Sequence, residues 1–249
     1  MVAMATEYMM KTVLITGAAG GIGSAIARRF AEEPYRLALC YHHNRKGAET
    51  LYRQLSERCP VALFGGDLSS AEDVDAIYHG VRKIYGGVDI LINNAGTSDI
   101  RLYTDYSHQD ILRILSVNLM GAMLLSKVVL PGMVSARFGR IINIGSMWGQ
   151  YGASCEVPYS SAKAGIVGFT KALAKEAGPS GVTVNCVSPG LIDTPMNRAI
   201  EPESLRTLID TIPVGRMGTP EEVAEAVFFF ASEQAGYING QVLGVDGGI

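Results

Sequence analysis

Tyr159 and Lys163 have the residue types and the spacing that acid–base chemistry needs. They lie four residues apart in PYSSAKAGIVGFTKALAKEAG, where the apolar spacing predicts a helix, so both side chains leave one face of it. An ammonium about 5 Å from a phenol, at an effective dielectric of about 20, favours the phenolate by about 3 kcal/mol, or roughly two pKa units. The pair therefore predicts a tyrosine that exchanges protons near neutral pH. Taken alone, so short a pattern more often belongs to an ordinary surface helix, and the assignment depends on the rest of the chain.

A glycine-rich segment near the N-terminus follows a short apolar run. Residues 11–16 have the length and composition of a β-strand, the sequence GAAGGIG follows at 17–23, and SAIARRFAEE then has a helical pattern. In this order, backbone N–H groups at the helix N-terminus can face a pyrophosphate. Gly17 would make the turn, and Gly21 and Gly23 would allow close approach. The segment predicts a dinucleotide site, and the alternative is a purely structural turn.

Seven strand-like apolar runs alternate with helical segments along the chain. They cover residues 12–16, 36–41, 61–64, 88–92, 140–145, 182–187 and 241–245. This alternation predicts an α/β protein, a single-domain doubly wound Rossmann fold whose parallel sheet of about seven strands has helices on both faces. No repeat or linker marks a second domain, so residues 11–249 are expected to form one domain and residues 1–10 a loose N-terminal tail.

Composition excludes several classes of function. The 249 residues carry 21 Lys and Arg against 24 Asp and Glu, which leaves no basic excess for nucleic acid. The four cysteines lack paired metal-ligand spacing, so we expect no metal site, no disulfide and a reducing, cytoplasmic location. The first ten residues do not resemble a signal peptide, and the apolar stretches are predicted to be too short to span a membrane.

Several motifs recur at the spacing of one known family. They are TGAAGGIG at 16–23, Asn93-Asn94-Ala95-Gly96, Asn118, Ser146, Tyr159 with Lys163, and Ser188-Pro189-Gly190. From residue 11 to 249 the chain resembles the short-chain dehydrogenase/reductases. The resemblance implies an enzyme that transfers hydride between a nicotinamide cofactor and a carbonyl or secondary alcohol carbon.

The resemblance also implies a role for each of four catalytic residues. Tyr159 would donate the proton to the developing alkoxide during reduction, and Ser146 would hydrogen-bond the same oxygen. Lys163 would hold the nicotinamide ribose and lower the pKa of Tyr159. Asn118 would support a water in the proton relay through its backbone. As alternatives, Asn118 could satisfy a helix bend and Ser146 could end a strand.

Cofactor preference should be set where the second strand ends, because an acidic residue there binds the ribose 2′-OH of NAD and repels the 2′-phosphate of NADP. No carboxylate stands at residues 40–45, while His42, His43 and Arg45 could pair with a phosphate. NADPH is therefore favoured over NADH, although Gly20 occupies a position where many NADP-preferring relatives carry a basic residue. The alternative is that the polar residues at 42–45 only solvate a loop.

Further cofactor contacts follow from the resemblance. Asp67-Leu68 resembles the family's adenine contact. Asn94-Ala95-Gly96 resembles the wall beside the nicotinamide ribose, although it could instead be a strand-ending turn. Residues 189–194 resemble the segment that contacts the nicotinamide carboxamide, and a mobile substrate lid is expected to follow them as far as Pro213. The predicted cofactor residues are Gly17, Gly20, Gly21, Ile22, Gly23, Tyr41, His42, His43, Asn44, Arg45, Asp67, Leu68, Asn94, Ala95, Gly96, Tyr159, Lys163, Pro189, Gly190, Ile192 and Thr194.

Substrate choice stays open between two resemblances. The length, the motifs and the C-terminal QVLGVDGG resemble those of bacterial 3-oxoacyl-acyl-carrier-protein reductases. The acidic carrier protein of these enzymes docks on basic residues. Arg137 matches one of the basic positions, but Ser180 stands at the second. The sequence WGQYGASCE at 148–156 resembles a subgroup that reduces 5-aminopentanone carried on elongation factor P. Glu156 would suit a cationic amine. Alternatively, it caps the following helix or pairs with a neighbour.

The remaining expectations concern the pocket wall, other functions and assembly. Met147, Trp148 and Tyr151 could wall the substrate pocket or anchor their loop. Reduction of another small ketone or a steroid, or a dinucleotide-binding redox sensor without turnover, are further alternatives. The consecutive rings Phe228 to Phe230 cannot all be buried in one subunit, which predicts a partner surface, and the family resemblance implies a homotetramer.

Overall fold

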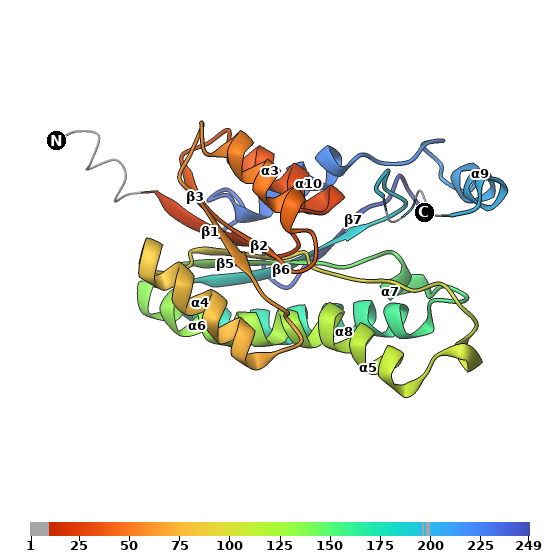
Figure 1. The fold of residues 1–249 in the computed structure, drawn as a ribbon, viewed down its shortest axis with the longest axis horizontal. Helices are drawn as coiled ribbons and strands as arrows, with labels where there is room; N and C mark the ends of the chain where they lie inside the picture. Colours follow the sequence, from red (N-terminus) through yellow and green to blue (C-terminus); the bar gives the residue numbers. More distant parts are fainter. Residues whose placement is uncertain (1–9, 196, 198–199) are drawn as a thin grey trace.

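The computed structural model describes residues 10–195, 197 and 200–249, and its middle layer is one parallel sheet (Figure 1). The seven strands lie in the order β3-β2-β1-β4-β5-β6-β7. Their bounds are β1 Lys11–Ile15, β2 Tyr35–Tyr41, β3 Val61–Gly65, β4 Ile90–Asn93, β5 Gly139–Ile144, β6 Val182–Pro189 and β7 Val242–Val245. All seven predicted strands are confirmed, with ends shifted by no more than a few residues.

Helices cover both faces of the sheet, as Figure 1 shows. The helices α2 Gly21–Phe30, α3 Arg45–Leu55 and α10 Pro220–Ala231 lie on one face, and α4 Ala71–Tyr85, α6 Gly121–Ala136 and α8 Val157–Ala177 on the other. The shorter helices α5 His108–Leu115, α7 Trp148–Tyr151 and α9 Pro202–Asp210 lie toward the right-hand end of the view, where the strands end. The doubly wound, single-domain α/β fold is confirmed.

Burial on both faces explains why the strand sequences are almost continuously apolar. In β1, Val13 and Ile15 pack under α2, α3 and α10, whereas Leu14 packs against the cluster formed with α4, α6 and α8. Because strand side chains alternate between faces, adjacent residues of one strand supply both cores. The edge strand β7 differs, with Leu243 40 % exposed.

The strand order reverses between β1 and β4. The chain runs outward through β1, β2 and β3, then returns so that Ile15 of β1 lies beside Ile92 of β4. Ligands of open α/β sheets bind in the crevice outside the carboxyl ends of the strands at such a switch point. The glycine-rich turn after β1 and the Asn93–Gly96 segment at the end of β4 meet there, so the topology places both predicted motifs at one edge.

One expectation about apolar segments was wrong. The helices α5 and α6 are joined by a π-helical segment, Ser116–Met120, into a continuous helical rod, His108–Ala136, of 29 residues. Within the described residues this is the one helix whose length and composition would allow it to cross a membrane. Polar residues such as Ser116 and Asn118 divide the apolar run in the sequence, whereas the helix continues through them. In the structure the rod carries buried residues such as Leu125 and Val129, which pack in the core beside the sheet.

Two other predictions lie partly outside the described residues. The predicted tail at 1–10 is described only at Met10, and the predicted lid lacks description at residues 196 and 198–199. Within the described part of the lid, α9 packs through Leu205, Leu208 and Ile209 against a buried apolar cluster that includes Met147 of the loop after β5.

Candidate active site

Tyr159 lies in the first turn of α8, next to Pro158. Proline is tolerated at the start of a helix, because the backbone N–H that it lacks would have no partner within the helix there. The phenol of Tyr159 lies near the side chain of Ser146, which follows β5 and whose hydrogen-bonding effect lowers the pKa of the phenol. One turn further along α8, the ammonium of Lys163 donates to the carbonyl oxygen of Ile144 at 2.8 Å and lies 5.6 Å from the centre of the Tyr159 ring. The structure therefore brings the predicted tyrosine, serine and lysine together.

The electrostatics of this group differ from the sequence-based expectation. Burial raises the pKa of Tyr159 to about 12, against the lowering effect of its hydrogen bond with Ser146, and the Glu156 carboxylate raises it further. Burial lowers the pKa of Lys163 to about 8. The predicted lowering of the Tyr159 pKa is wrong in direction, because burial of the phenol itself disfavours the phenolate.

Asn118 lies in the π-helical segment, a type of local widening often found at functional sites. Its amide nitrogen donates to the carbonyls of Thr97 at 2.7 Å and Ile114 at 2.9 Å, and its amide oxygen accepts from the backbone N–H of Thr97 at 3.2 Å. A Cβ on Gly96 would lie 2.7 Å from the Asn118 amide oxygen and 3.6 Å from the Lys163 nitrogen. The fourth predicted catalytic residue thus lies beside Lys163, across Gly96.

The glycine-rich turn has the geometry that a pyrophosphate site needs. Gly17 has φ +61°, and a Cβ on Gly23 would lie 2.3 Å from the Gly17 carbonyl oxygen. Helix α2 begins at Gly21 with no side-chain cap and no acidic residue in its first turn, and Gly20 is exposed. Its first N–H groups, including that of Ile22, are therefore directed toward an anion position, and the residues present fit a bound dinucleotide.

Thr16 ties this turn to the end of β4, a role that the sequence analysis missed. Its hydroxyl accepts from the backbone N–H groups of Asn94 and Ala95, both at 2.9 Å, and the Asn94 side chain donates back to the Thr16 carbonyl at 2.9 Å. Thr16 directly precedes Gly17, so a polar residue ending an otherwise apolar strand was the available signal. Asn94, Ala95 and Gly96 are brought to the turn as predicted.

The loop after β2 presents mostly exposed polar side chains. The rings of His42 and His43 lie 3.7 Å apart, and Asn44 caps α3 by accepting from Gly47 while donating to the Ala19 carbonyl of the glycine-rich turn at 3.3 Å. Arg45 pairs with Glu49 at 2.8 Å. The loop is thus attached to the predicted pyrophosphate site, whereas the Arg45 guanidinium is engaged by a carboxylate one turn along α3.

The remaining predicted cofactor residues lie along the same edge of the sheet. Hydrogen bonding from the Ser69 backbone holds the pKa of Asp67 below its usual value, and the nearby His42 and His43 act in the same direction. Leu68 packs against Gly121, and Thr194 packs so closely on Gly21 that a Cβ there would lie 2.8 Å from its methyl group. Three further predicted residues continue this segment, with Pro189 ending β6, Gly190 packed against Asp246 and Ile192 bridging to Gly218.

The predicted pocket residues after β5 have separate roles. Met147 is buried in an apolar cluster with lid residues, and Trp148 packs against that cluster. Tyr151 is exposed, and its hydroxyl donates to the carbonyl of Ile249 at 3.1 Å. Met147 and Trp148 thus connect the catalytic edge to the lid, whereas Tyr151 anchors its loop to the C-terminus.

Glu156 occupies the N-cap position of α8, but its side chain makes no capping hydrogen bond. Its carboxylate accepts instead from the hydroxyl of Ser98, in the loop after β4, and burial raises its pKa. The capping alternative is therefore wrong, and Ser98 is a partner that the sequence analysis missed. Glu156 is a half-buried acid close enough to Tyr159 to raise the pKa of the phenol.

A dinucleotide-accepting turn and a tyrosine–serine–lysine group on one edge of a parallel sheet define a nicotinamide-dependent oxidoreductase of the Rossmann type. A family model described as Enoyl-(Acyl carrier protein) reductase matches residues 17–249. The chain belongs to the short-chain dehydrogenase/reductase family.

Similar proteins cover nearly the whole chain. An uncharacterized oxidoreductase, YmfI, of Bacillus subtilis is 39 % identical over 96 % of this chain and 99 % of its own. The 3-oxoacyl-[acyl-carrier-protein] reductase FabG of Vibrio cholerae is 40 % identical over 96 % of this chain and 97 % of its own. That of Aquifex aeolicus is 38 % identical over 99 % of this chain and all of its own, 100 %. The expected family and its oxidoreductase class are confirmed.

Proposed function

We propose that the protein reduces a ketone to a secondary alcohol with NADPH. The observation that carries this proposal is the convergence of Tyr159, Ser146, Lys163 and Asn118 beside a turn that fits a dinucleotide. A bound nicotinamide supplies the hydride, and the protein supplies position and a proton. A sensor that binds without turnover would not need these four side chains together.

Tyr159 is the proposed proton donor. A pKa of about 12 keeps its phenol protonated at neutral pH, which suits donation to an oxygen that gains charge during reduction. Ser146 would hydrogen-bond the same oxygen, since its side chain lies close enough to Tyr159 to influence the pKa of the phenol. Lys163 would hold the nicotinamide ribose, and Asn118 would keep the π-helical carbonyls in place for a water that returns protons to Tyr159.

The preference for NADPH over NADH rests on the loop after β2. No carboxylate follows β2 directly, and His42, His43 and Arg45 are exposed where a 2′-phosphate would be bound. The Arg45–Glu49 ion pair is exposed, so a phosphate can replace Glu49 as the partner of the guanidinium at small cost.

A 3-oxoacyl group on acyl carrier protein is the first candidate substrate. The relatives from Vibrio cholerae and Aquifex aeolicus are named for this activity. Arg137, exposed at the C-terminal end of α6 with φ +52°, supports docking of an acidic carrier, while Ser180 supplies no second cation.

A ketone that carries an amine, such as 5-aminopentanone on elongation factor P, is the second candidate. Glu156 favours it, because a half-buried carboxylate beside Tyr159 attracts an ammonium, whereas a neutral 3-oxoacyl chain carries no charge for it to bind. Its raised pKa shows that burial without a cation disfavours the charged form, so a substrate ammonium would stabilise the carboxylate.

Assembly and location complete the proposal. Phe230 is buried and Phe228 packs against the aromatic group of Phe30 and Tyr35, but Phe229 is 45 % exposed on α10. We propose a homotetramer in the cytoplasm that binds neither nucleic acid nor membrane. Sedimentation as a monomer at micromolar concentration would contradict the assembly.

The decisive experiment compares NADPH and NADH oxidation with acetoacetyl-CoA, a neutral ketone and a short amino ketone. Tyr159-dependent NADPH oxidation with acetoacetyl-CoA supports the carrier-thioester substrate. Glu156→Gln should raise the KM for the amino ketone selectively if the second candidate is correct, and an equal effect on the neutral ketone would exclude it. Stoichiometric NADPH binding without turnover of any of the three ketones would favour a sensor.

A further inference from the structure

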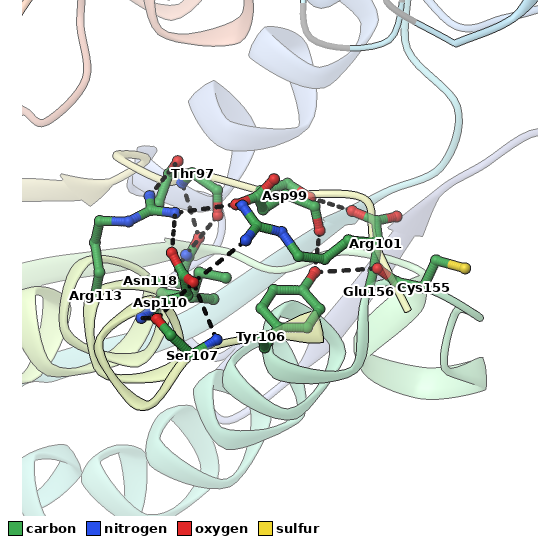
Figure 2. Close-up of polar contacts among 12 residues, drawn as sticks. Thr97, Asp99, Arg101, Tyr106, Ser107, Asp110, Arg113, Asn118, Cys155 and Glu156 are labelled. Atoms are coloured by element: carbon green, nitrogen blue, oxygen red, sulfur yellow. Dashed lines mark hydrogen bonds and ion pairs between the residues drawn. The ribbon is translucent and has the colours of Figure 1, made fainter. Parts of the chain in front are cut away.

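The loop after β4 meets the turn at Cys155 through the backbone carbonyl of Cys155 (Figure 2). The carbonyl oxygen of Cys155 accepts from the backbone N–H of Arg101 at 3.0 Å and lies 3.1 Å from the hydroxyl of Tyr106, which also reaches the carbonyl of Asp99. Cys155 has φ +64°, an uncommon conformation for a residue with a side chain. These contacts hold the Cys155 turn in a conformation that its own backbone disfavours.

The loop that supplies these donors is fixed by ion pairs. Arg101 pairs with Asp99 and, at 3.3 Å, with Asp110, while Arg113 pairs with Asp99 at 3.3 Å. Asp110 also closes the capping box of α5 with Ser107, and this hydrogen bonding holds the pKa of the Asp110 carboxyl below its usual value. The Tyr106 ring is buried, so its hydroxyl is presented from a fixed position.

The joined loops lie between two proposed catalytic residues. On one side, Thr97 exchanges hydrogen bonds with Asn118. On the other, Ser98 donates to Glu156, whose carbonyl accepts from Ser160 at 2.9 Å in the first turn of α8. The place of the Ser98–Glu156 pair, beside Tyr159, therefore depends on how the Cys155 turn is held.

We propose that Tyr106 is a positioning residue, whose hydroxyl holds the Cys155 turn so that the Ser98–Glu156 pair stays fixed on the substrate side of Tyr159. This inference rests on the proposed function, in which Glu156 faces the substrate. The glycine-rich turn and the loop after β2, which carry the predicted pyrophosphate and 2′-phosphate contacts, belong to other elements, so the main effect should fall on substrate binding. Ser98 and Tyr106 act through the same pair of loops, and their effects should not add.

The test is Tyr106→Phe, which removes the hydroxyl and keeps the buried ring. The matched control is Tyr103→Phe, in the same loop, where the ring is 57 % exposed. With acetoacetyl-CoA, Tyr106→Phe should raise the substrate KM roughly fivefold, the factor that loss of one net hydrogen bond gives, and leave the KM for NADPH unchanged. Adding Ser98→Ala to Tyr106→Phe should cost less than the product of the two single effects.

A second measurement does not depend on turnover. Cys155 is the one partly exposed cysteine, since Cys40, Cys59 and Cys186 are buried, so iodoacetamide labelling of Cys155 reports how firmly the turn is held. Tyr106→Phe should accelerate this labelling severalfold, and Tyr103→Phe should not. Two results would overturn the proposal. One is a Cys155 labelling rate in Tyr106→Phe equal to that in the wild type, together with kinetic effects of Tyr106→Phe and Ser98→Ala that simply multiply. The other is a rise in the KM for NADPH as large as the rise in the KM for the substrate. Absence of turnover with acetoacetyl-CoA would count against the proposed function alone, and the labelling rates would still decide the role of Tyr106.

Discussion

The proposed dinucleotide side and the proposed substrate side of Tyr159 are held together by different kinds of contact. On the dinucleotide side, glycines, backbone groups and short side chains pack within a few ångströms, as where Gly23 meets Gly17 and Asn94. On the substrate side, ion pairs such as Arg101–Asp110 fix the loop after β4, and the Ser98–Glu156 hydrogen bond joins that loop to a segment remote in sequence. Backbone packing tolerates no added atom, whereas exposed ion pairs are individually weak. Small substitutions on the dinucleotide side should therefore cause large losses of stability or binding, whereas single substitutions on the substrate side should cause smaller losses.

The largest effect is expected at the boundary between the two sides. Tyr159→Phe should lower kcat roughly 10²- to 10⁴-fold, the contribution of a positioned proton donor, because the ring stays while the proton is lost. Steady-state kinetics with acetoacetyl-CoA, together with NADPH titration by fluorescence, measure turnover and binding separately. A change in NADPH affinity much smaller than the loss of kcat is the expected control result, and retention of more than a tenth of the turnover would contradict the assignment of Tyr159.

The pH dependence of stability reports how strongly Lys163, on the dinucleotide side, is desolvated. Its pKa of about 8 lies below the ordinary value of 10.5, so between these values the unfolded chain binds a proton that the folded chain does not. Stability should rise with pH through this window and be lost as the pH falls toward 8. Relative to Lys163→Met, the wild type should gain about 2 kcal/mol in unfolding free energy between about pH 7.5 and about pH 9.5.

Urea unfolding of both proteins at the two pH values measures this gain. The comparison stays below pH 10, because Tyr159, with its raised pKa, would reduce stability above that value. Parallel changes in wild type and Lys163→Met would show that the ammonium is not buried in solution.

Gly23→Ala tests the intolerance of the dinucleotide side. The added Cβ would lie 2.3 Å from the Gly17 carbonyl oxygen and 2.7 Å from the Asn94 side-chain nitrogen. We expect a loss of about 1–3 kcal/mol in unfolding free energy and weaker NADPH binding. Gly168→Ala is the matched control, because it lies within α8 where a Cβ meets nothing within 4 Å. It should stabilise the protein by roughly 0.5–1 kcal/mol, and equal destabilisation by both substitutions would remove the contrast.

The smallest expected effect is at the exposed end of the same side. Arg45→Ala should raise the KM for NADPH about threefold to tenfold and leave that for NADH unchanged, since only NADPH carries the phosphate that the guanidinium would bind. Lys46→Ala, the neighbouring exposed cation, is the control. An equal rise for both cofactors after Arg45→Ala would point to distortion of the loop instead of phosphate recognition.

The contrast also explains which parts of the molecule can be predicted from the sequence. The strands, the glycine-rich turn and the Tyr159 helix are encoded by residues close together in the chain, and the structure has them where the patterns indicate. The hydrogen bonds of the Thr16 hydroxyl could not be predicted, because its partners, Asn94 and Ala95, are about eighty residues away in the sequence. The Ser98–Glu156 pair and the Asp99–Arg101 network have no periodicity, so only the folded chain reveals them.

The electrostatic error has a related cause. Residue spacing correctly places Lys163 one turn from Tyr159, but it carries no information on burial or on the Ile144 carbonyl that receives the ammonium. Distance alone favoured a phenolate, and desolvation reversed the result. A pattern can therefore identify the members of such a group before it can give their protonation.

The π-helical segment Ser116–Met120 has a consequence for the length of the chain. A π turn accommodates one residue more than the α-helix on either side, so this segment is equivalent to a single-residue insertion in the rod formed by α5 and α6. Deleting one residue there would restore a regular helix and preserve the packing of both flanking halves, while withdrawing Asn118 from Thr97. The protein should therefore still fold after this deletion, but the proposed proton path through the π-helical segment would be lost.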